Sequence, residues 1–181
     1  MPAPKRPRKL AAEELFEYAV RCLTSRIYSI GDLTAKLRLR AAHIPDVAAT
    51  MDRLKDIGYV SDERFAESFA RARVENDGFG KIRVLNDLRR HRIPGELADQ
   101  AVEQALDGKT EAELIDAYIE RRMPSVAQGG KIEDEKKLAS AFRRLRRAGF
   151  TTRPILDALK NLAARPEALE DFPEEEPDEG Q

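Results

Sequence analysis

The chain has 181 residues, with 32 Lys and Arg against 33 Asp and Glu, so its formal net charge is −1. Charged residues make up 36% of the chain and aromatic residues only 6%, a composition that favours a thin, elongated helical body over one thick core. The single cysteine excludes an intrachain disulfide and fits a reducing, cytoplasmic setting, and no apolar run approaches the ~18 residues of a membrane span.

The charges are unevenly distributed along the chain. From Arg165 to the end there are eight acidic residues and one basic residue, which leaves 31 basic and 25 acidic residues in 1–164, a net charge of +6. Residues 1–9 hold three prolines and four basic residues and are predicted to be a disordered basic arm. Residues 165–181 are predicted to be a disordered acidic tail. A basic body favours a nucleic-acid or acidic-protein partner.

Residues 10–60 predict a first three-helix repeat. Apolar residues recur at helical spacing over residues 11–25. Ser29 is the predicted N-cap of the second helix, because its hydroxyl can accept from an otherwise unpaired backbone N–H. Pro45 suits the first position of the third helix, and Gly58 can close that helix in the left-handed conformation.

Residues 61–108 predict a second repeat on the same plan. Ser61 and Asp62 carry side-chain oxygens that can cap its first helix. The pair Asp77-Gly78 breaks the chain after that helix, and Gly108 ends the third helix. The helical spacing predicts a core made of Phe65, Phe69, Leu85, Leu88 and Leu97.

Residues 109–164 predict a third repeat. Thr110 and Glu113 form a capping box, residues 124–130 form a longer loop, and Gly149 closes the helix that precedes the last one. Three sets of about 50 residues lie in the range of repeat arrays, in which neighbouring units must stack to bury their faces. The expected fold is all-α, with nine principal helices in three tandem three-helix repeats.

The residues needed for catalysis are missing. His43 and His91 have no ligand-spaced partner for a metal, and Cys22 falls on a buried helical stripe as a small core residue. Residues 78–81 contain Gly and Lys but lack the spacing of a phosphate loop. The chain is therefore predicted not to be an enzyme and to need no cofactor or metal.

Basic residues recur at matching places in the second and third repeats. Their spacing predicts one basic stripe that contacts DNA or an acidic protein; the alternative is a solvated face. The predicted binding residues are Lys81, Arg83, Arg89, Arg90, Arg92, Lys136, Arg143, Arg144 and Arg147.

At these residues the chain resembles the RecX family of bacterial recombinase regulators. The similarity covers S-x-x-D-L-x-x-K-L at 29–37, G-Y-V-S-D-E-R-F-A at 58–66, and G-x-x-R-V-x-x-x-L at 80–88. The family commonly has Lys-Gly where this chain has His91-Arg92, which predicts a changed helix closure. The matching positions are Ser29, Leu33, Leu37, Gly58, Tyr59, Asp62, Arg64, Phe65, Ala66, Arg73, Gly80, Arg83 and Leu88.

The resemblance implies an elongated, curved array of three-helix repeats. The chain is expected to be a monomer. It also implies binding to the RecA–single-stranded DNA filament, with inhibition of its ATPase, strand-exchange and coprotease activities. Two alternatives stay open: a helical protein that binds DNA directly without RecA, because three-helix sets resemble helix-turn-helix units, and a helical scaffold for another protein. Affinity for the filament compared with DNA alone distinguishes them.

Overall fold

The computed structural model describes residues 8–169 and 172, and this part of the chain is helical. Its only β pairing is two isolated bridges, Leu10 with Ala41 and Ile132 with Ala163. None of the helices described is long and apolar enough to cross a bilayer. The α-helices are α1 (Ala12–Ser25), α2 (Ile30–Arg38), α3 (Pro45–Asp56), α4 (Asp62–Ala72), α5 (Lys81–Arg90), α6 (Gly95–Leu106), α7 (Glu111–Arg122), α8 (Pro124–Ala127), α9 (Glu135–Ala148) and α10 (Thr152–Leu162).

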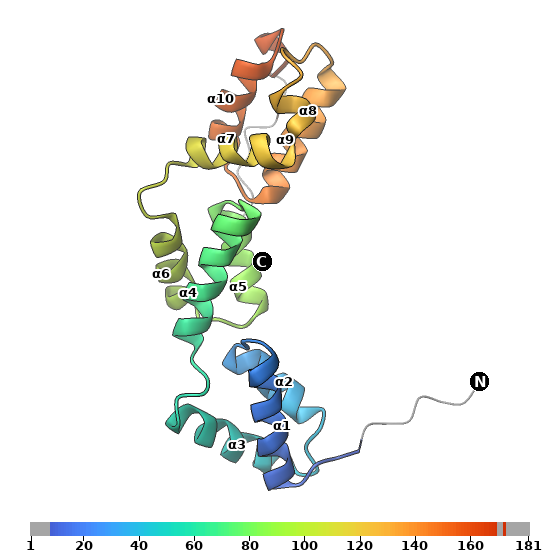
Figure 1. Cartoon of the computed structure of the whole chain (residues 1–181). Helices are drawn as coiled ribbons and strands as arrows, with labels where there is room; N and C mark the ends of the chain where they lie inside the picture. The colour runs from blue at the N-terminus through green and yellow to red at the C-terminus, as the bar shows by residue number, and fades with distance from the viewer. Residues whose placement is uncertain (1–7, 170–171, 173–181) are drawn as a thin grey trace, which may run out of the picture.

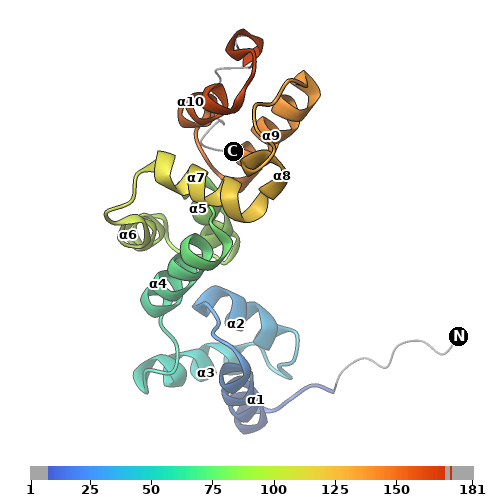
Figure 2. The ribbon, with the colours of Figure 1, turned by 45° about the horizontal axis from the view of Figure 1, so that its top comes forward.

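The helices form three sets that follow one another along an elongated, curved molecule (Figures 1 and 2). The sets are α1 to α3, α4 to α6, and α7 to α10, and each packs around its own hydrophobic core. Phe79 and Leu114 contact the cores of both the second and the third set. The all-α array of three-helix repeats is therefore confirmed. The short α8 is a tenth helix, which lies where a loop was predicted.

Local side-chain chemistry sets the helix ends as expected. The hydroxyls of Ser29, Ser61 and Thr110 accept from the backbone N–H three residues on, and Thr110 forms the full capping box. Gly58, Gly108 and Gly149 all have positive φ, as the stop signals predict. The first helix of the second repeat runs on into a π-helix, Arg73–Asp77, before Gly78 ends it.

The core of the second repeat differs in part from the predicted one. Phe65 and Leu88 are buried, but Phe69, Leu85 and Leu97 are only partly buried and pack against the cluster from its edge. The Phe69 ring lies at the edge of the core, where it stacks on the Phe65 ring and meets the His91 ring edge-on.

Phe69→Ala is therefore expected to lower the free energy of unfolding by about 2 kcal/mol, below the roughly 3–5 kcal/mol of a fully buried phenylalanine. Urea denaturation followed by circular dichroism measures the change. An unchanged midpoint would show that the ring adds nothing to the core.

The predicted acidic tail begins later than residue 165. Pro166–Leu169 form a 3-10 helix in which Leu169 is 2% exposed and belongs to the third core. The Phe172 ring lies 5.0 Å from the Phe142 ring, centroid to centroid. The prediction of disorder is wrong for these residues. Two apolar side chains within the acidic run, Leu169 and Phe172, pack against the third core. The rest of the tail and residues 1–7 of the arm lie outside the described residues.

The first and second repeats meet at the N-terminus of α2. The Ser29 hydroxyl donates to the His91 carbonyl (2.7 Å), and the Ile30 N–H donates to Asp62 Oδ1 (2.8 Å). The Asp32 carboxylate lies 2.6 Å from His91 Nδ1 and 2.6 Å from Arg92 Nη1. Burial raises the pKa of the Asp62 carboxyl above its ordinary value. His91 thus joins two repeats.

The helix closure at His91-Arg92 is unusual. Arg92 has φ 62°, a left-handed conformation that costs a non-glycine residue about 1–2 kcal/mol. The corresponding position in the third repeat is Gly149, with φ 94°. The ion pair of Arg92 with Asp32 holds this conformation in place. The departure from the family pattern is therefore accommodated at the junction between repeats.

The second and third repeats meet in the same way, at the N-terminus of α5. The Gly80 N–H donates to the Ala148 carbonyl (2.8 Å), and the Ile82 N–H donates to the Gly149 carbonyl (3.2 Å). At both junctions the start of one repeat's second helix meets the end of the corresponding helix in the next repeat. Positive and negative helix ends face each other there, which favours the contact.

Candidate partner-binding surface

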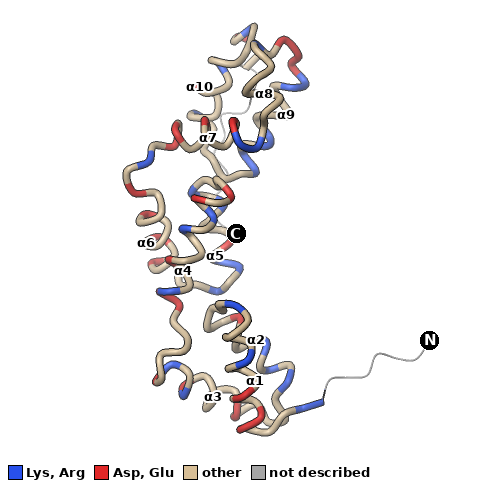
Figure 3. Tube along the Cα trace, viewed as in Figure 1, with Lys and Arg blue, Asp and Glu red and all other residues tan. Residues whose placement is uncertain are grey.

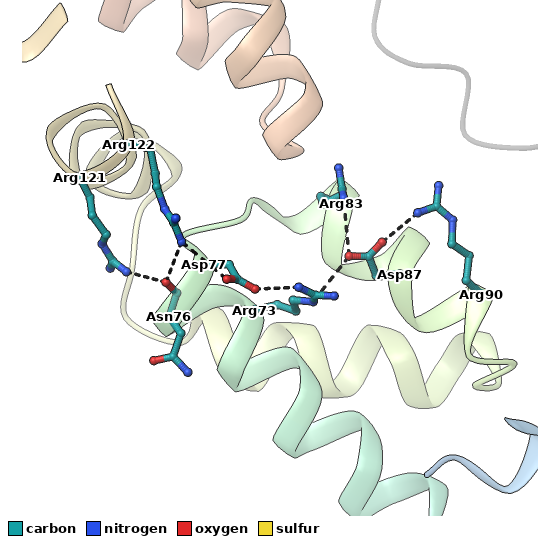
Figure 4. A network of polar contacts seen from close by, with 8 residues as sticks. All are labelled: Arg73, Asn76, Asp77, Arg83, Asp87, Arg90, Arg121 and Arg122. Atoms are coloured by element: carbon teal, nitrogen blue, oxygen red, sulfur yellow. Dashed lines mark hydrogen bonds and ion pairs between the residues drawn. The ribbon is translucent and has the colours of Figure 1, made fainter. Parts of the chain in front are cut away.

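A buried carboxylate organises the basic residues of α5. The Asp87 side chain is 8% exposed, and it lies 3.3 Å from Arg83 Nε, 3.1 Å from Arg90 Nη1 and 3.7 Å from Arg73 Nε (Figure 4). Arg83 and Arg90 were predicted as cations facing a partner. Both pair with Asp87, because a nearly buried carboxylate requires hydrogen-bonding cations. Part of their charge is therefore neutralised within the protein.

Aromatic rings hold two of these guanidinium groups. The Arg73 guanidinium lies 4.9 Å from the centre of the Phe69 ring and 5.7 Å from that of Phe79, and Arg83 lies 5.0 Å from the centre of Phe79. Arg73 also donates to the Asp77 carboxylate at 2.8 Å. Rings and carboxylates together fix the directions in which these side chains point.

Arginines of α7 connect this network to the third repeat. Arg121 donates to the carbonyls of Glu75 (3.1 and 3.0 Å) and Asn76 (2.8 Å), and Arg122 donates to the Asn76 carbonyl (3.2 Å; Figure 4). These carbonyls belong to the π-helix, whose C-terminal end attracts cations. The contacts fix α7 across the end of the second repeat.

The exposed face of α9 carries the predicted cations of the third repeat. Lys136, Arg143, Arg144 and Arg147 are all exposed, whereas Leu138 and Phe142 are buried on the opposite face, as the helical period predicts. In Figure 3 the basic ends of α7 and α9 lie beside the start of α5. Arg144 Nη2 donates to the Arg122 carbonyl (2.5 Å), and Arg83 Nη1 donates to the Arg147 carbonyl (3.2 Å).

These contacts bring three of the predicted arginines together around a cavity of about 440 Å³ between the second and third repeats. It is lined by Phe79, Arg83, Tyr118, Ser140, Arg144, Arg147 and Ala148. Lys136 and Arg143 do not line it. Lys81 and Arg89 lie exposed on α5, with Arg89 donating to the Asn86 side chain, and Arg92 pairs with Asp32. Of the nine predicted residues, Arg83, Arg144 and Arg147 thus line one cavity. The role of the whole set in binding stays a prediction.

Most of the residues that carry the family resemblance have structural roles. Leu33, Leu37, Ala66 and Leu88 are completely buried, and the Arg64 guanidinium donates to the Gly58 carbonyl. Ser29, Asp62 and Gly80 make the contacts between repeats described above. Tyr59 is the exception, with 53% of its surface exposed.

Sequence reasoning missed the acidic members of the site. Asp87 lies four residues after Arg83 and three before Arg90, and this helical spacing was the available signal for the pairs. The contacts of Arg121 and Arg122 had no such local signal, because their acceptors lie about 45 residues earlier in the chain.

Comparison with known proteins places the chain in a family. A family model described as "RecX, second three-helix domain" matches residues 61–102. A protein of Mycobacterium sp. (strain KMS) named "Regulatory protein RecX" is 30% identical over 151 residues, which cover 81% of this chain and 80% of the relative. The chain belongs to the RecX family. A protein of Deinococcus radiodurans named "Regulatory protein RecX" is 29% identical over 180 residues, which cover 98% of this chain and 80% of the relative.

Solved RecX structures share the fold. The crystal structure of RecX from Lactobacillus salivarius aligns with a TM-score of 0.66 at 17% identity, covering 83% of this chain and 96% of the other. A second crystal structure, of regulatory protein RecX, aligns with a TM-score of 0.63 at 18% identity. The alignment covers 83% of this chain and 73% of the other. RecX family membership makes the chain a regulatory protein.

Proposed function

We propose that this chain binds the RecA–single-stranded DNA filament in the cytoplasm and inhibits its ATPase, strand-exchange and coprotease activities. Such inhibition modulates recombinational DNA repair and the SOS response. The observation that carries the proposal is the group of exposed cations on α9 beside the cavity between the second and third repeats. Basic groups on a rigid, elongated body suit a long, negatively charged partner.

The geometry supports α9 as the main contact more strongly than α5. Arg83 and Arg90 share Asp87, whereas Arg143 and Arg147 project from the exposed face of α9. The proposed contact residues on α9 are therefore Lys136, Arg143, Arg144 and Arg147. The α5 residues Lys81, Arg83, Arg89, Arg90 and the nearby Arg92 are assigned to the edge of the same surface.

Reversing two charges on α9 tests the proposal. The variant with both Arg143→Glu and Arg147→Glu is expected to need roughly tenfold more protein for half-inhibition of RecA ATPase on single-stranded DNA, because each rim charge contributes to association. The control carries Arg71→Glu and Arg153→Glu, which change the net charge equally at exposed positions of α4 and α10.

The control is expected to inhibit like the unaltered protein, and both variants are expected to keep the helical circular dichroism signal. Equal inhibition by the two double variants would contradict α9 as the binding surface. The unaltered protein could instead bind DNA alone as tightly as it binds the RecA filament, with an affinity for DNA that falls steeply with salt. In that case the direct DNA-binding alternative replaces the proposal.

A further inference from the structure

Helix α9 carries a strong excess of positive charge, with six basic residues and one acidic residue. Lys136, Arg143 and Arg147 are exposed and share one face of the helix, at spacings of seven and four residues. Within the described part of the chain, no ion pair involves these three side chains. Like charges four residues apart, such as Arg143 and Arg147, destabilise a helix. This face of α9 would therefore be stabilised by an anionic segment lying over it.

An acidic segment of the chain begins beside this helix. Leu169 is buried in the third core, and the Phe172 ring packs against Phe142 of α9 with 5.0 Å between the ring centres. Residues 173–181 follow Phe172 and contain five acidic residues and no basic residue. The acidic residues are Glu174, Glu175, Glu176, Asp178 and Glu179. The contacts of Leu169 and Phe172 thus place the start of the acidic segment next to the basic helix.

The length of the acidic segment matches the length of the basic face. Lys136 and Arg147 are eleven residues apart, or about 16 Å along the helix axis at roughly 1.5 Å per residue. Residues 174–179 span at most about 17 Å when fully extended. The first acidic residue comes two positions after Phe172, within about 7 Å of it. The acidic residues can therefore reach the three cations from the point at which Phe172 is held.

We propose that residues 174–179 dock on the face of α9 formed by Lys136, Arg143 and Arg147, and that an anionic partner must displace them from it. The second part rests on the proposed function, in which the same face contacts the RecA filament. Each exposed ion pair is weak, but a tethered segment acts at an effective concentration on the order of mM, so several weak contacts are sufficient. Salt screens such contacts beyond about 10 Å at 0.1 M, so the docking weakens as ionic strength rises.

A spin label at the end of the acidic segment tests the docking in the full chain, without RecA or DNA. A nitroxide is attached to the Gly180→Cys protein, which also carries Cys22→Ala so that only one thiol is present. At low salt, the NMR amide signals of residues 136–147 are expected to lose roughly half or more of their intensity relative to the reduced label. The signals of the first repeat are expected to keep their intensity, and high salt is expected to restore those of α9.

Charge variants identify the surface on which the segment docks. Arg143→Gln together with Arg147→Gln is expected to restore most of the α9 signal at low salt. Arg38→Gln together with Arg71→Gln removes the same charge at exposed positions of α2 and α4 and is expected to leave the loss of signal unchanged. Thermal melts check that each variant is folded.

Three results would overturn the docking. The first is full α9 signal in the spin-labelled chain at low salt, and the second is an unchanged loss of signal in the Arg143→Gln, Arg147→Gln variant. The third uses a mixture of spin-labelled chain without isotope and isotope-labelled chain without a spin label. Equal loss of signal in this mixture would show that the segment docks on a second copy of the chain.

Neutralising the acidic segment tests its competition with the partner. The variant with Glu174→Gln, Glu175→Gln and Glu176→Gln is expected to need about threefold less protein for half-inhibition of RecA ATPase at low salt, because the partner no longer displaces the segment. The difference is expected to shrink as salt rises, since screening weakens the docking in the unaltered chain.

The matched control removes three negative charges elsewhere. Glu96→Gln, Asp99→Asn and Glu103→Gln change exposed positions of α6, and this variant is expected to inhibit like the unaltered protein. Equal gains in the two triple variants would show that net charge alone sets the inhibition and would overturn the competition. The spin-label measurement omits RecA, so docking found in a chain that fails to inhibit RecA ATPase would contradict the proposed function and leave the docking established.

Discussion

Gly149→Ala is expected to lower the free energy of unfolding by about 3–4 kcal/mol. Gly149 has φ 94°, and a Cβ there would lie 2.3 Å from the Arg83 backbone nitrogen. The left-handed conformation costs alanine roughly 1–3 kcal/mol. Crowding against the backbone of α5 adds roughly 1–3 kcal/mol, because the start of that helix cannot move without breaking its contact with the end of α9.

Gly108→Ala is the matched control for this substitution. Gly108 also has positive φ, 71°, but a Cβ there would meet nothing within 4 Å. Only the backbone term applies, so a loss of about 1–2 kcal/mol is expected. Urea denaturation followed by circular dichroism measures both. Similar losses for the two variants would show that the second and third repeats are not closely packed at this point.

The features predicted well from the sequence are the ones that depend on near neighbours. Ser29, Ser61 and Thr110 cap helices because each acts within its own turn, and Gly58 ends a helix through its own backbone freedom. The exposed face of α9 follows from the helical period alone. Such interactions are local, so composition and spacing are sufficient to identify them.

The features that could not be predicted depend on distant residues. His91 pairs with Asp32, 59 residues earlier in the chain, and Leu169 joins a core from within an acidic run. From the sequence, Arg83 and Arg147 were identified as basic helix positions. Only the fold shows that the Arg83 guanidinium pairs with the Asp87 carboxylate and that Arg147 borders a cavity. Charge counting cannot distinguish a cation that stabilises the protein from one available to a partner.

Asp87→Ala is the substitution that tests this distinction directly, and it is expected to lower the free energy of unfolding by about 3 kcal/mol. It removes the carboxylate that Arg73, Arg83 and Arg90 share. The exposed fractions of these three arginine side chains are 35%, 39% and 74%, respectively. Removal of one partner from a buried ion pair costs about 3–5 kcal/mol, and solvent around the arginines places this case at the lower end. Asp52→Ala, which breaks an exposed pair with Lys55 at 3.5 Å, should cost about 0–1 kcal/mol.

Anions should restore part of the stability of the Asp87→Ala protein, because three guanidinium groups without their carboxylate form an anion site. Sulfate stabilises proteins generally, so the informative quantity is the gain of the Asp87→Ala protein beyond the gain of the unaltered protein over the same sulfate range. An extra gain that saturates with concentration is expected, because binding at a specific site saturates whereas the general effect does not. Equal gains in the two proteins would show that the arginines move apart into solvent once Asp87 is removed, so that the network in Figure 4 holds them only through this one carboxylate.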